Sequence, residues 1–297
     1  MAHEHAHPPK KDFGRAFALG ITLNVVYILV EAGYGISINS LALIADAGHN
    51  LSDVLGLLLA WAASFLVRKS RTEKYTYGFK KSSVLAAFLN ALILLVAIGA
   101  IIWEAVGRLS NPHPIPGTTV MLVAGIGVLI NTVTALLFFS GRKEDLNIKG
   151  AFLHMAADAA ISFGVVLVGI VLTFSQLFWL DPLVSIVIAL IIFWGTWGLL
   201  KDSVNLALDA VPDNIDKQGI ETYINSLDEV VSFHDLHIWA MSTTETALTV
   251  HIVTDKTIDQ DRFIHKIYDM LSDKFSIQHT TIQIEHRGEE ACRQNRI

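Results

Sequence analysis

The sequence predicts an all-α transmembrane domain of six helices at residues 13–211, followed by a small α+β domain at residues 212–297. Mean hydropathy is +0.48, and only 17% of the 297 residues are charged, which is below the typical fraction of about 25%. Residues 1–211 carry 14 basic and 13 acidic side chains, whereas residues 212–297 carry 8 and 15. The sequence therefore divides into an apolar part and an acidic, more soluble part.

Composition also excludes several classes of protein. The high hydropathy excludes a disordered chain. The net charge of −6 argues against a nucleic-acid partner, and a single cysteine permits no intrachain disulfide.

Six segments are long and apolar enough to cross a bilayer, whose core takes about 20 residues of helix. Four of them are uncharged, whereas the first contains Glu31 and the second contains Asp46 and Asp53. In chain order the segments are residues 16–36, 41–67, 82–103, 118–141, 159–180 and 182–200. The polar faces that buried helices of a soluble protein would show are missing, and no signal-peptide cleavage site follows the first segment.

Basic residues alternate between the two ends of these segments. They gather in the N-terminal arm (residues 1–12), at residues 68–81 and at residues 142–149, whereas the first and fifth connections have none and the third has only Arg108. Because basic loops stay in the cytoplasm, both termini and the acidic domain are predicted to be cytoplasmic.

The second and fifth helices each carry the pattern H-x-x-x-D, as His49 with Asp53 and His154 with Asp158. Residues four apart share one helix face, so each helix presents an imidazole beside a carboxylate. Two nitrogens and two oxygens suit tetrahedral Zn²⁺. The alternative is a pair of His–Asp contacts that only hold the helices together.

The same four side chains also suit exchange of metal for protons, because metal and proton compete for the same lone pairs. Asp46 lies three residues before His49 and is a candidate to orient the His49 ring. Glu31, Glu104 and Asp181 lie nearer helix ends, where we expect them to snorkel or to cap helices.

Enzymatic activity is not expected. The nucleophile elbow G-x-S-x-G and the ATP-binding P-loop are absent from the sequence, and the metalloprotease pattern H-E-x-x-H occurs only at residues 3–7, in the polar N-terminal arm rather than in a segment with helical periodicity. Transport would therefore be driven by ion gradients rather than by ATP. The rival hypotheses are a membrane metal sensor that binds zinc without moving it, an intramembrane metalloenzyme and a carrier of organic cations.

Apolar spacing in the acidic domain predicts the order αββαβ. The helices are expected at residues 213–228 and 259–275, and the strands at 230–241, 247–254 and 280–285. His234, His251 and Glu285 fall on three different strands and could form a second metal site, although surface histidines are commonly only solvated. Histidines 3, 5 and 7 could form a metal-catching arm, or reflect chance composition.

Six short motifs together resemble the cation diffusion facilitators, and most closely the bacterial zinc, cadmium and cobalt efflux members of that family. The motifs are DAGHNLSD (46–53), YTYGFKK (75–81), HMAAD (154–158), LDP (180–182), HDLHIW (234–239) and TIQIE (281–285). The resemblance covers nearly the whole chain.

The resemblance implies a homodimer that works by alternating access, with a metallochaperone-like cytoplasmic domain. It places the transport site on His49, Asp53, His154 and Asp158, and the histidine on the second helix favours zinc. It places a second, dimer-stabilising metal site on His234, His251 and Glu285, where zinc would be structural. The segment 68–79 holds no histidine or aspartate, so the loop metal site of some relatives is expected to be missing, and Cys292 alone makes a weak site.

The sequence thus predicts a zinc/proton antiporter that exports Zn²⁺, with Cd²⁺ and Co²⁺ as further substrates. Its partners would be a divalent metal ion, protons, the lipid bilayer and a second copy of the chain. The short segments that connect the helices favour a bacterial inner membrane.

Overall fold

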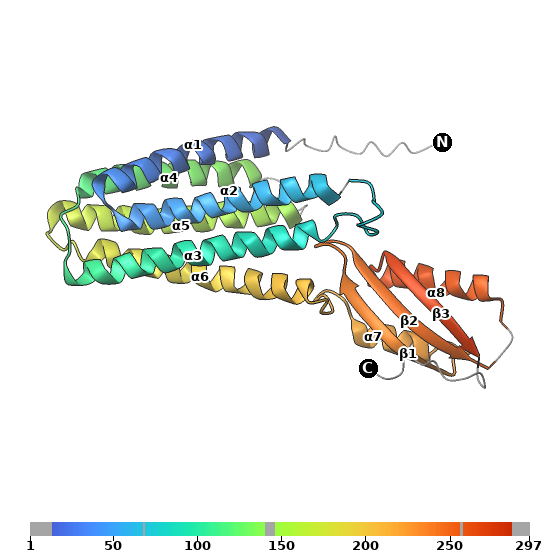
Figure 1. The fold of residues 1–297 in the computed structure, drawn as a ribbon. Helices are drawn as coiled ribbons and strands as arrows, with labels where there is room; N and C mark the ends of the chain where they lie inside the picture. The colour runs from blue at the N-terminus through green and yellow to red at the C-terminus, as the bar shows by residue number, and fades with distance from the viewer. Residues whose placement is uncertain (1–13, 68, 140–145, 256–257, 287–297) are drawn as a thin grey trace, which may run out of the picture. The chain divides into compact units, whose positions relative to one another are not determined.

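The computed structural model describes residues 14–67, 69–139, 146–255 and 258–286 (Figure 1). The histidines of the N-terminal arm and Cys292 lie outside this range. The chain forms two compact units, Met1–Leu57 with Ile93–Thr196 and Leu58–Leu92 with Trp197–Ile297, and helices α2, α3 and α6 contribute to both.

Six long helices precede residue 208 in the described part of the chain. They are α1 (Gly14–Ile38), α2 (Leu41–Val67), α3 (Ser82–Ser110), α4 (Gly117–Phe138), α5 (Leu146–Phe174) and α6 (Leu180–Ala207). Four spans within α3, α4, α5 and α6 are long and apolar enough to cross a membrane, with mean hydropathy between 2.2 and 2.7. Large apolar side chains on these helices, such as Trp103, Phe174 and Trp194, are exposed, as lipid-facing residues are.

The fifth helix differs from the predicted segment. The uncharged run at residues 159–180 suggested its position, but α5 begins at Leu146 and ends at Phe174. Helix hydrogen bonding does not stop at a polar residue, so an uncharged run marks only part of a helix. As a result, His154 and Asp158 lie two to three turns inside α5 rather than at its start.

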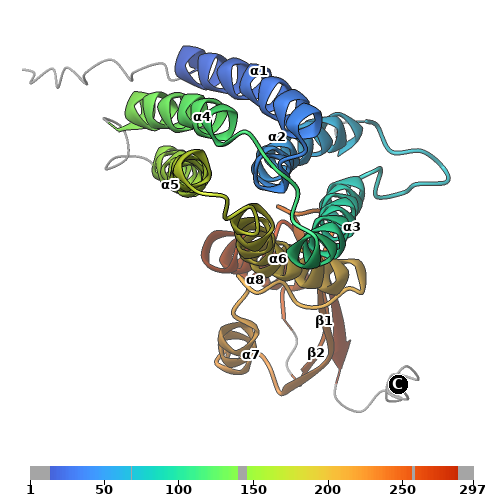
Figure 2. The same ribbon diagram turned by 90° about the vertical axis from the view of Figure 1, so that its left-hand side faces the viewer.

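In the first unit, α4 packs between α1 and α5 (Figure 2). Two glycines bring α4 and α5 into close contact. A Cβ atom at Gly117 would lie 2.5 Å from the backbone nitrogen of Thr173, and one at Gly169 would lie 2.5 Å from that of Met121. Small residues commonly permit such close helix pairs in membranes.

The start of α2 is held by Asp181 of α6. The Asp181 carboxylate accepts hydrogen bonds from the Leu41 and Ala42 backbone nitrogens, at 2.8 and 3.3 Å, and from the Ser40 hydroxyl, at 2.6 Å. These donors are among the unpaired groups of a helix N-terminus, and the negative charge matches the helix dipole. The expected capping role of Asp181 is confirmed, although the capped helix is α2 rather than its own.

The C-terminal part of the second unit contains α7 (Lys217–Asn225), β1 (Ser232–Ala240), β2 (Thr246–Thr254), α8 (Gln260–Phe275) and β3 (His279–His286), in that order. Strand β2 is central, antiparallel to β1 and parallel to β3. Asp259 caps α8 by accepting a hydrogen bond from the Arg262 backbone nitrogen, and Ser276 ends the helix in a left-handed conformation with φ of 55°.

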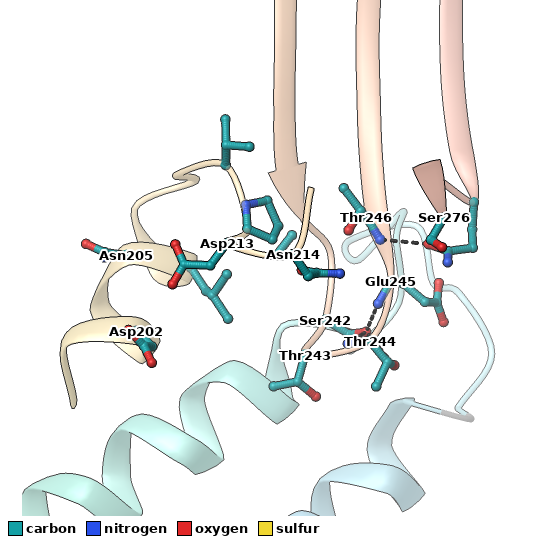
Figure 3. Close-up of a pocket in the computed structure, with 15 residues that line it drawn as sticks. Asp202, Asn205, Asp213, Asn214, Ser242, Thr243, Thr244, Glu245, Thr246 and Ser276 are labelled. Carbon is teal, nitrogen blue, oxygen red and sulfur yellow. Dashed lines mark hydrogen bonds between the residues drawn. The ribbon is translucent and has the colours of Figure 1, made fainter. Parts of the chain in front are cut away.

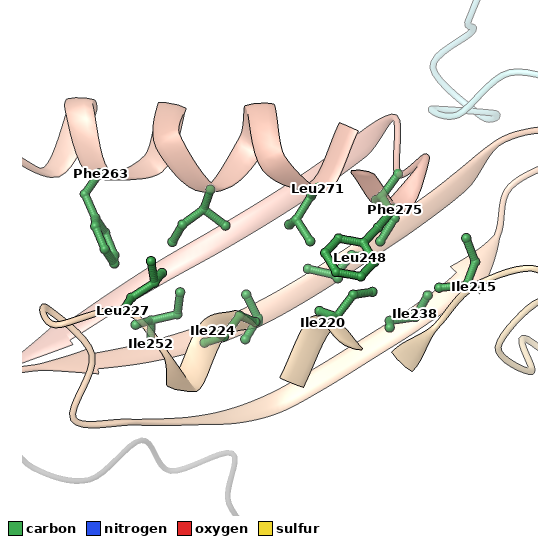
Figure 4. Packing of buried hydrophobic residues seen from close by; sticks show 13 residues of the cluster. Ile215, Ile220, Ile224, Leu227, Ile238, Leu248, Ile252, Phe263, Leu271 and Phe275 are labelled. Atoms are coloured by element: carbon green, nitrogen blue, oxygen red, sulfur yellow. The ribbon is translucent and has the colours of Figure 1, made fainter. Parts of the chain in front are cut away.

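Both short helices pack on one face of the sheet (Figure 4). Alternate residues of β2, Leu248, Val250 and Ile252, face a buried cluster with side chains of α7 and α8. The residues between them, including His251, therefore lie on the opposite face, which the helices leave open.

We expect Asp181→Ala to lower the free energy of unfolding by about 2 kcal/mol, because buried donors at the start of α2 lose a charged acceptor. The thermal unfolding midpoint of the detergent-solubilised protein measures the effect. Glu104→Gln is the matched control, since Glu104 is half exposed and its ion pair among the described residues is with Arg108, one turn away. Equal midpoints for the two variants would contradict the capping role.

Candidate metal centres

The two H-x-x-x-D motifs meet in the first unit. His49 and Asp53 come from α2, and His154 and Asp158 come from α5. Each histidine contacts the aspartate of the other helix. Nε2 of His49 lies 3.3 Å from Oδ1 of Asp158, and Nε2 of His154 lies 3.2 Å from Oδ2 of Asp53. These four residues are called the interhelical cluster below.

The spacing of the interhelical cluster suits a tetrahedral ion. Ligand atoms of His49, Asp53 and Asp158 lie within 4.8 Å of one another, and Nε2 of His154 is also 3.7 Å from Oδ2 of Asp158. Zinc bonds of about 2.0–2.2 Å at tetrahedral angles place ligand atoms about 3.3–3.6 Å apart. The contacts of 3.2–3.7 Å lie close to that range and exceed the roughly 2.7–2.9 Å of a direct charged hydrogen bond.

The interhelical cluster is closed on one side and open on the other. The side chains of Asp158 and His49 are 2% and 17% exposed, whereas those of Asp53 and His154 are 33% and 43% exposed. An ion held here would have Asp158 and His49 on its buried side, and it would enter and leave past Asp53 and His154.

Asp46 is fully buried near this cluster. Its carboxylate accepts a hydrogen bond from the Ser162 hydroxyl of α5 at 2.8 Å, while Nδ1 of His49 has no hydrogen-bond partner among the described residues. The contact by which Asp46 would orient the His49 ring is therefore not formed in this structure.

Glu31 does not snorkel or cap a helix, so the expectation for this residue is wrong. Its side chain is fully buried, and Oε1 accepts a hydrogen bond from the Tyr27 hydroxyl at 2.6 Å. Helical spacing places Glu31 on the inner face of α1, which a position near the end of an apolar run did not reveal. Glu104, in contrast, pairs at the surface with Arg108.

A second group of candidate ligands lies on the open face of the C-terminal sheet. His234 of β1 pairs directly with His251 of β2, and their rings are 5.2 Å apart. Nδ1 of His251 and Nε2 of His234 lie 3.1 and 3.6 Å from the two carboxylate oxygens of Glu285 on β3. These three residues are called the sheet-face cluster.

The sheet-face cluster fits a zinc ion chemically. Nδ1 of His251 and Nε2 of His234 are both buried without a hydrogen-bond partner among the described residues, and both face Glu285. Two imidazoles and one carboxylate form a common ligand set for zinc.

The sequence did not single out Asp235, which joins this cluster. A β-bulge interrupts the pairing between His234 and His237, and Asp235 has a left-handed φ of 54° there. Its carboxylate therefore lies 3.7 Å from Nε2 of His251, on the side of that ring away from Glu285. A carboxylate in this place is a common partner for the second nitrogen of a metal-binding histidine. No local pattern in the sequence marks the bulge.

A cavity of about 290 Å³ lies elsewhere in the second unit, between the end of α6 and the turn that joins β1 to β2 (Figure 3). Asp202, Asp213 and Glu245 line it, and the Glu245 backbone nitrogen donates to the Ser242 hydroxyl at 3.0 Å. Glu245 also pairs with Lys80. This cavity contains no histidine or cysteine of the described residues and is separate from both clusters.

Two family models match the chain. Residues 17–206 match the cation efflux transmembrane domain, and residues 212–287 match the cytoplasmic domain of cation efflux proteins.

Several curated proteins are similar along nearly their whole length. The chain is 37% identical over 284 residues to the metal cation efflux system protein CzcD of Cupriavidus metallidurans, covering 95% of this chain and 89% of that protein. It is 34% identical over 290 residues to the cadmium, cobalt and zinc/H(+)-K(+) antiporter of Bacillus subtilis, covering 96% and 92%. It is 34% identical over 295 residues to the zinc transporter ZitB of Escherichia coli, covering 97% and 93%.

One similar solved structure is the metal-bound C-terminal domain of the CzcD transporter from Cupriavidus metallidurans. It is 42% identical to the matched part, covers 24% of this chain and 99% of that domain, and has a TM-score of 0.23.

We expect His237→Ala to raise the pKa of Asp235 toward its ordinary value of about 3.9. The hydrogen bond from His237, at 2.8 Å, is the largest cause that holds this pKa below its usual range. A carboxyl group with a lowered pKa stabilises the fold above its unfolded pKa, and this contribution is lost as the pH falls through the folded value. A pH titration of the Asp235 carboxyl carbon by NMR measures the change. His265→Ala, an exposed histidine on α8, is the control, and an unchanged pKa in His237→Ala would refute the expectation.

Proposed function

Because the chain belongs to the cation diffusion facilitator family, a family of metal transporters and not of enzymes, we propose that it exports Zn²⁺ from the cytosol in exchange for protons. It is an integral membrane protein. Cd²⁺ and Co²⁺, which the printed name of the Bacillus subtilis relative includes, are proposed as further substrates.

The observation that carries the proposal is the convergence of both H-x-x-x-D motifs on the interhelical cluster. Ligand atoms of His49, Asp53 and Asp158 lie within 4.8 Å of one another, and Nε2 of His154 lies 3.2 and 3.7 Å from the carboxylates of Asp53 and Asp158. Two carboxylates balance the charge of a divalent ion. The sole Lys or Arg side chain described in this unit is Arg108, which binds Glu104 and the backbone carbonyl oxygen of Asn39, so no basic side chain among those described there competes for the carboxylates.

Proton exchange follows from the chemistry of the same ligands. A histidine must be deprotonated to bind metal, so zinc arriving from the cytosol displaces protons. When the site opens to a more acidic exterior, protons return to the imidazoles and zinc leaves. Metal and proton then occupy the cluster in turn, which is an alternating-access antiporter that needs no ATP.

We further propose that all six long helices span the membrane, at residues 13–211, with both termini and residues 212–297 in the cytoplasm of a bacterial cell. Basic residues lie in alternate connections, which supports this orientation. The match to the cytoplasmic domain of cation efflux proteins supports the place of the second domain.

The sheet-face cluster is proposed to hold a structural zinc ion that stabilises a homodimer. His234, His251 and Glu285 would be its ligands, and Asp235 would hold the His251 ring in place. When bound, the ion would accept lone pairs from the two imidazole nitrogens and would balance the negative charge of the Glu285 carboxylate.

Zinc flux into liposomes tests the transport proposal. Purified protein would be reconstituted with a zinc-sensitive dye inside and an imposed pH gradient across the membrane. We expect uptake that follows the gradient and falls to background in the Asp53→Ala/Asp158→Ala double variant, because the site loses both carboxylates. Glu104→Gln, which leaves the interhelical cluster intact, should keep wild-type flux.

Near-normal flux in the double variant would overturn the site assignment. Zinc that binds to the wild-type protein but never crosses the membrane would favour the metal sensor over the transporter.

We expect His251→Ala to lower the number of zinc ions bound per chain by about one while gradient-driven flux continues, because this residue belongs to the structural site and not to the transport site. Metal content of the purified, dialysed protein gives the number. His265→Ala should bind as much zinc as the wild type. Loss of flux in His251→Ala, with normal folding, would argue that the sheet-face cluster carries cargo.

A further inference from the structure

Next to the interhelical cluster, the first unit contains two fully buried acidic side chains that the proposed transport site does not use. Glu31 lies on α1 and Asp46 on α2, and both are 0% exposed. The two carboxyl groups interact directly with each other.

Each carboxyl group has one oxygen with a donor and one without. Oε1 of Glu31 receives the Tyr27 hydroxyl at 2.6 Å, and Oδ2 of Asp46 receives the Ser162 hydroxyl at 2.8 Å. Oε2 of Glu31 and Oδ1 of Asp46 are buried and have no hydrogen-bond partner among the described residues. Ionised carboxylates only accept hydrogen bonds, so two of them cannot satisfy each other.

The surroundings supply no permanent positive charge that would hold both groups ionised, because His49, which acts on Asp46, is charged only when it is protonated. The groups that act on them are Tyr27 from α1, His49 and Asn50 from α2, and Asp158 and Ser162 from α5. The Asn50 amide acts on Glu31 as a neutral hydrogen-bond donor and brings no charge, and Asp158 adds a further negative charge when it is ionised. Arg108, the basic side chain described in this unit, is engaged with Glu104 and Asn39.

We propose that Glu31 and Asp46 share one proton, forming a proton-binding site distinct from the four metal ligands. One O–H between Oε2 of Glu31 and Oδ1 of Asp46 satisfies both unpartnered oxygens and leaves the pair with a single negative charge. Two buried carboxyl groups that share a proton avoid the repulsion of two adjacent anions.

The position of the pair couples it to metal binding, a step that rests on the proposed function. Asp46 lies one helical turn before His49, and its partner Ser162 lies one turn after Asp158. A divalent ion at the interhelical cluster raises the local positive potential and favours the doubly ionised pair. Zinc binding therefore releases the shared proton in addition to those displaced from the metal ligands.

Infrared spectroscopy of the metal-free, detergent-solubilised protein at neutral pH tests the shared proton. The carbonyl stretch of a protonated carboxylic acid is separate from the carboxylate bands and shifts in heavy water. We expect such a band in the wild type, and the loss of the same one-acid intensity in both Glu31→Gln and Asp46→Asn. Each amide can donate the hydrogen bond of the protonated acid but cannot release a proton.

Glu104→Gln is the matched control, because it removes an exposed carboxylate of the same unit and should leave the band unchanged. Absence of the band from the wild type would overturn the proposal even if a variant fails to fold. Loss of intensity in only one of the two variants would assign the proton to a single residue and overturn the sharing.

The same preparation tests the coupling. Adding Zn²⁺ should abolish the band, and a pH-indicator dye in weak buffer should record about one proton fewer released per zinc bound in Glu31→Gln and Asp46→Asn than in the wild type. A band that survives zinc binding would overturn the coupling. If the metal-free band is present but liposomes show no zinc flux, the shared proton stands and the transport proposal fails.

Discussion

The need to compensate buried acidic charge dominates the first unit. Four fully or nearly fully buried carboxyl groups lie among apolar helices, and the described part of this unit offers one basic side chain. Each group must find hydrogen-bond donors, a proton or a metal ion, because an isolated charge in a medium of low polarity is strongly unfavourable. Asp181 uses backbone amides, Asp158 faces histidines, and Glu31 and Asp46 face each other. The buried carboxyl groups therefore lie beside groups that can compensate their charge. Where the described residues offer no basic side chain, a metal ion or a proton can take that role.

The same constraint links the position of the cluster to the helix termini. Asp181 holds the first turn of α2, and eight residues later His49 projects toward α5. Glycines at positions 117 and 169 allow α4 to lie against the backbone of α5, the helix that contributes the other half of the cluster. Rigid helices held in this way keep the two ligand pairs in register without a loop in the site, as the proposed transport site requires.

In the C-terminal sheet, an irregularity of the backbone has a similar effect. Regular alternation would direct Asp235 toward the helix-covered face, opposite to His234. The bulge turns its carboxylate to the open face, where it meets His237 and His251. The buried cluster on the other face keeps the three strands in register, so that His234 and His251 stand directly opposite each other.

Periodicity and residue type were sufficient for the features that depend on local sequence. Helical spacing within residues 46–53 and 154–158 placed a histidine and an aspartate on one face of each helix, because this follows from backbone geometry alone. Only the tertiary structure decided that each histidine contacts the aspartate of the other helix. The bounds of α2 agree with the predicted segment, whereas α5 extends beyond its uncharged run because helical hydrogen bonds tolerate polar residues. Tertiary structure alone decided that Asp181 caps α2, that Asp235 joins the sheet-face cluster and that Glu31 is buried against Asp46. Those contacts join residues of different helices or depend on a bulge. The sequence of one segment does not reveal which residues of a distant segment will lie beside its charged side chains.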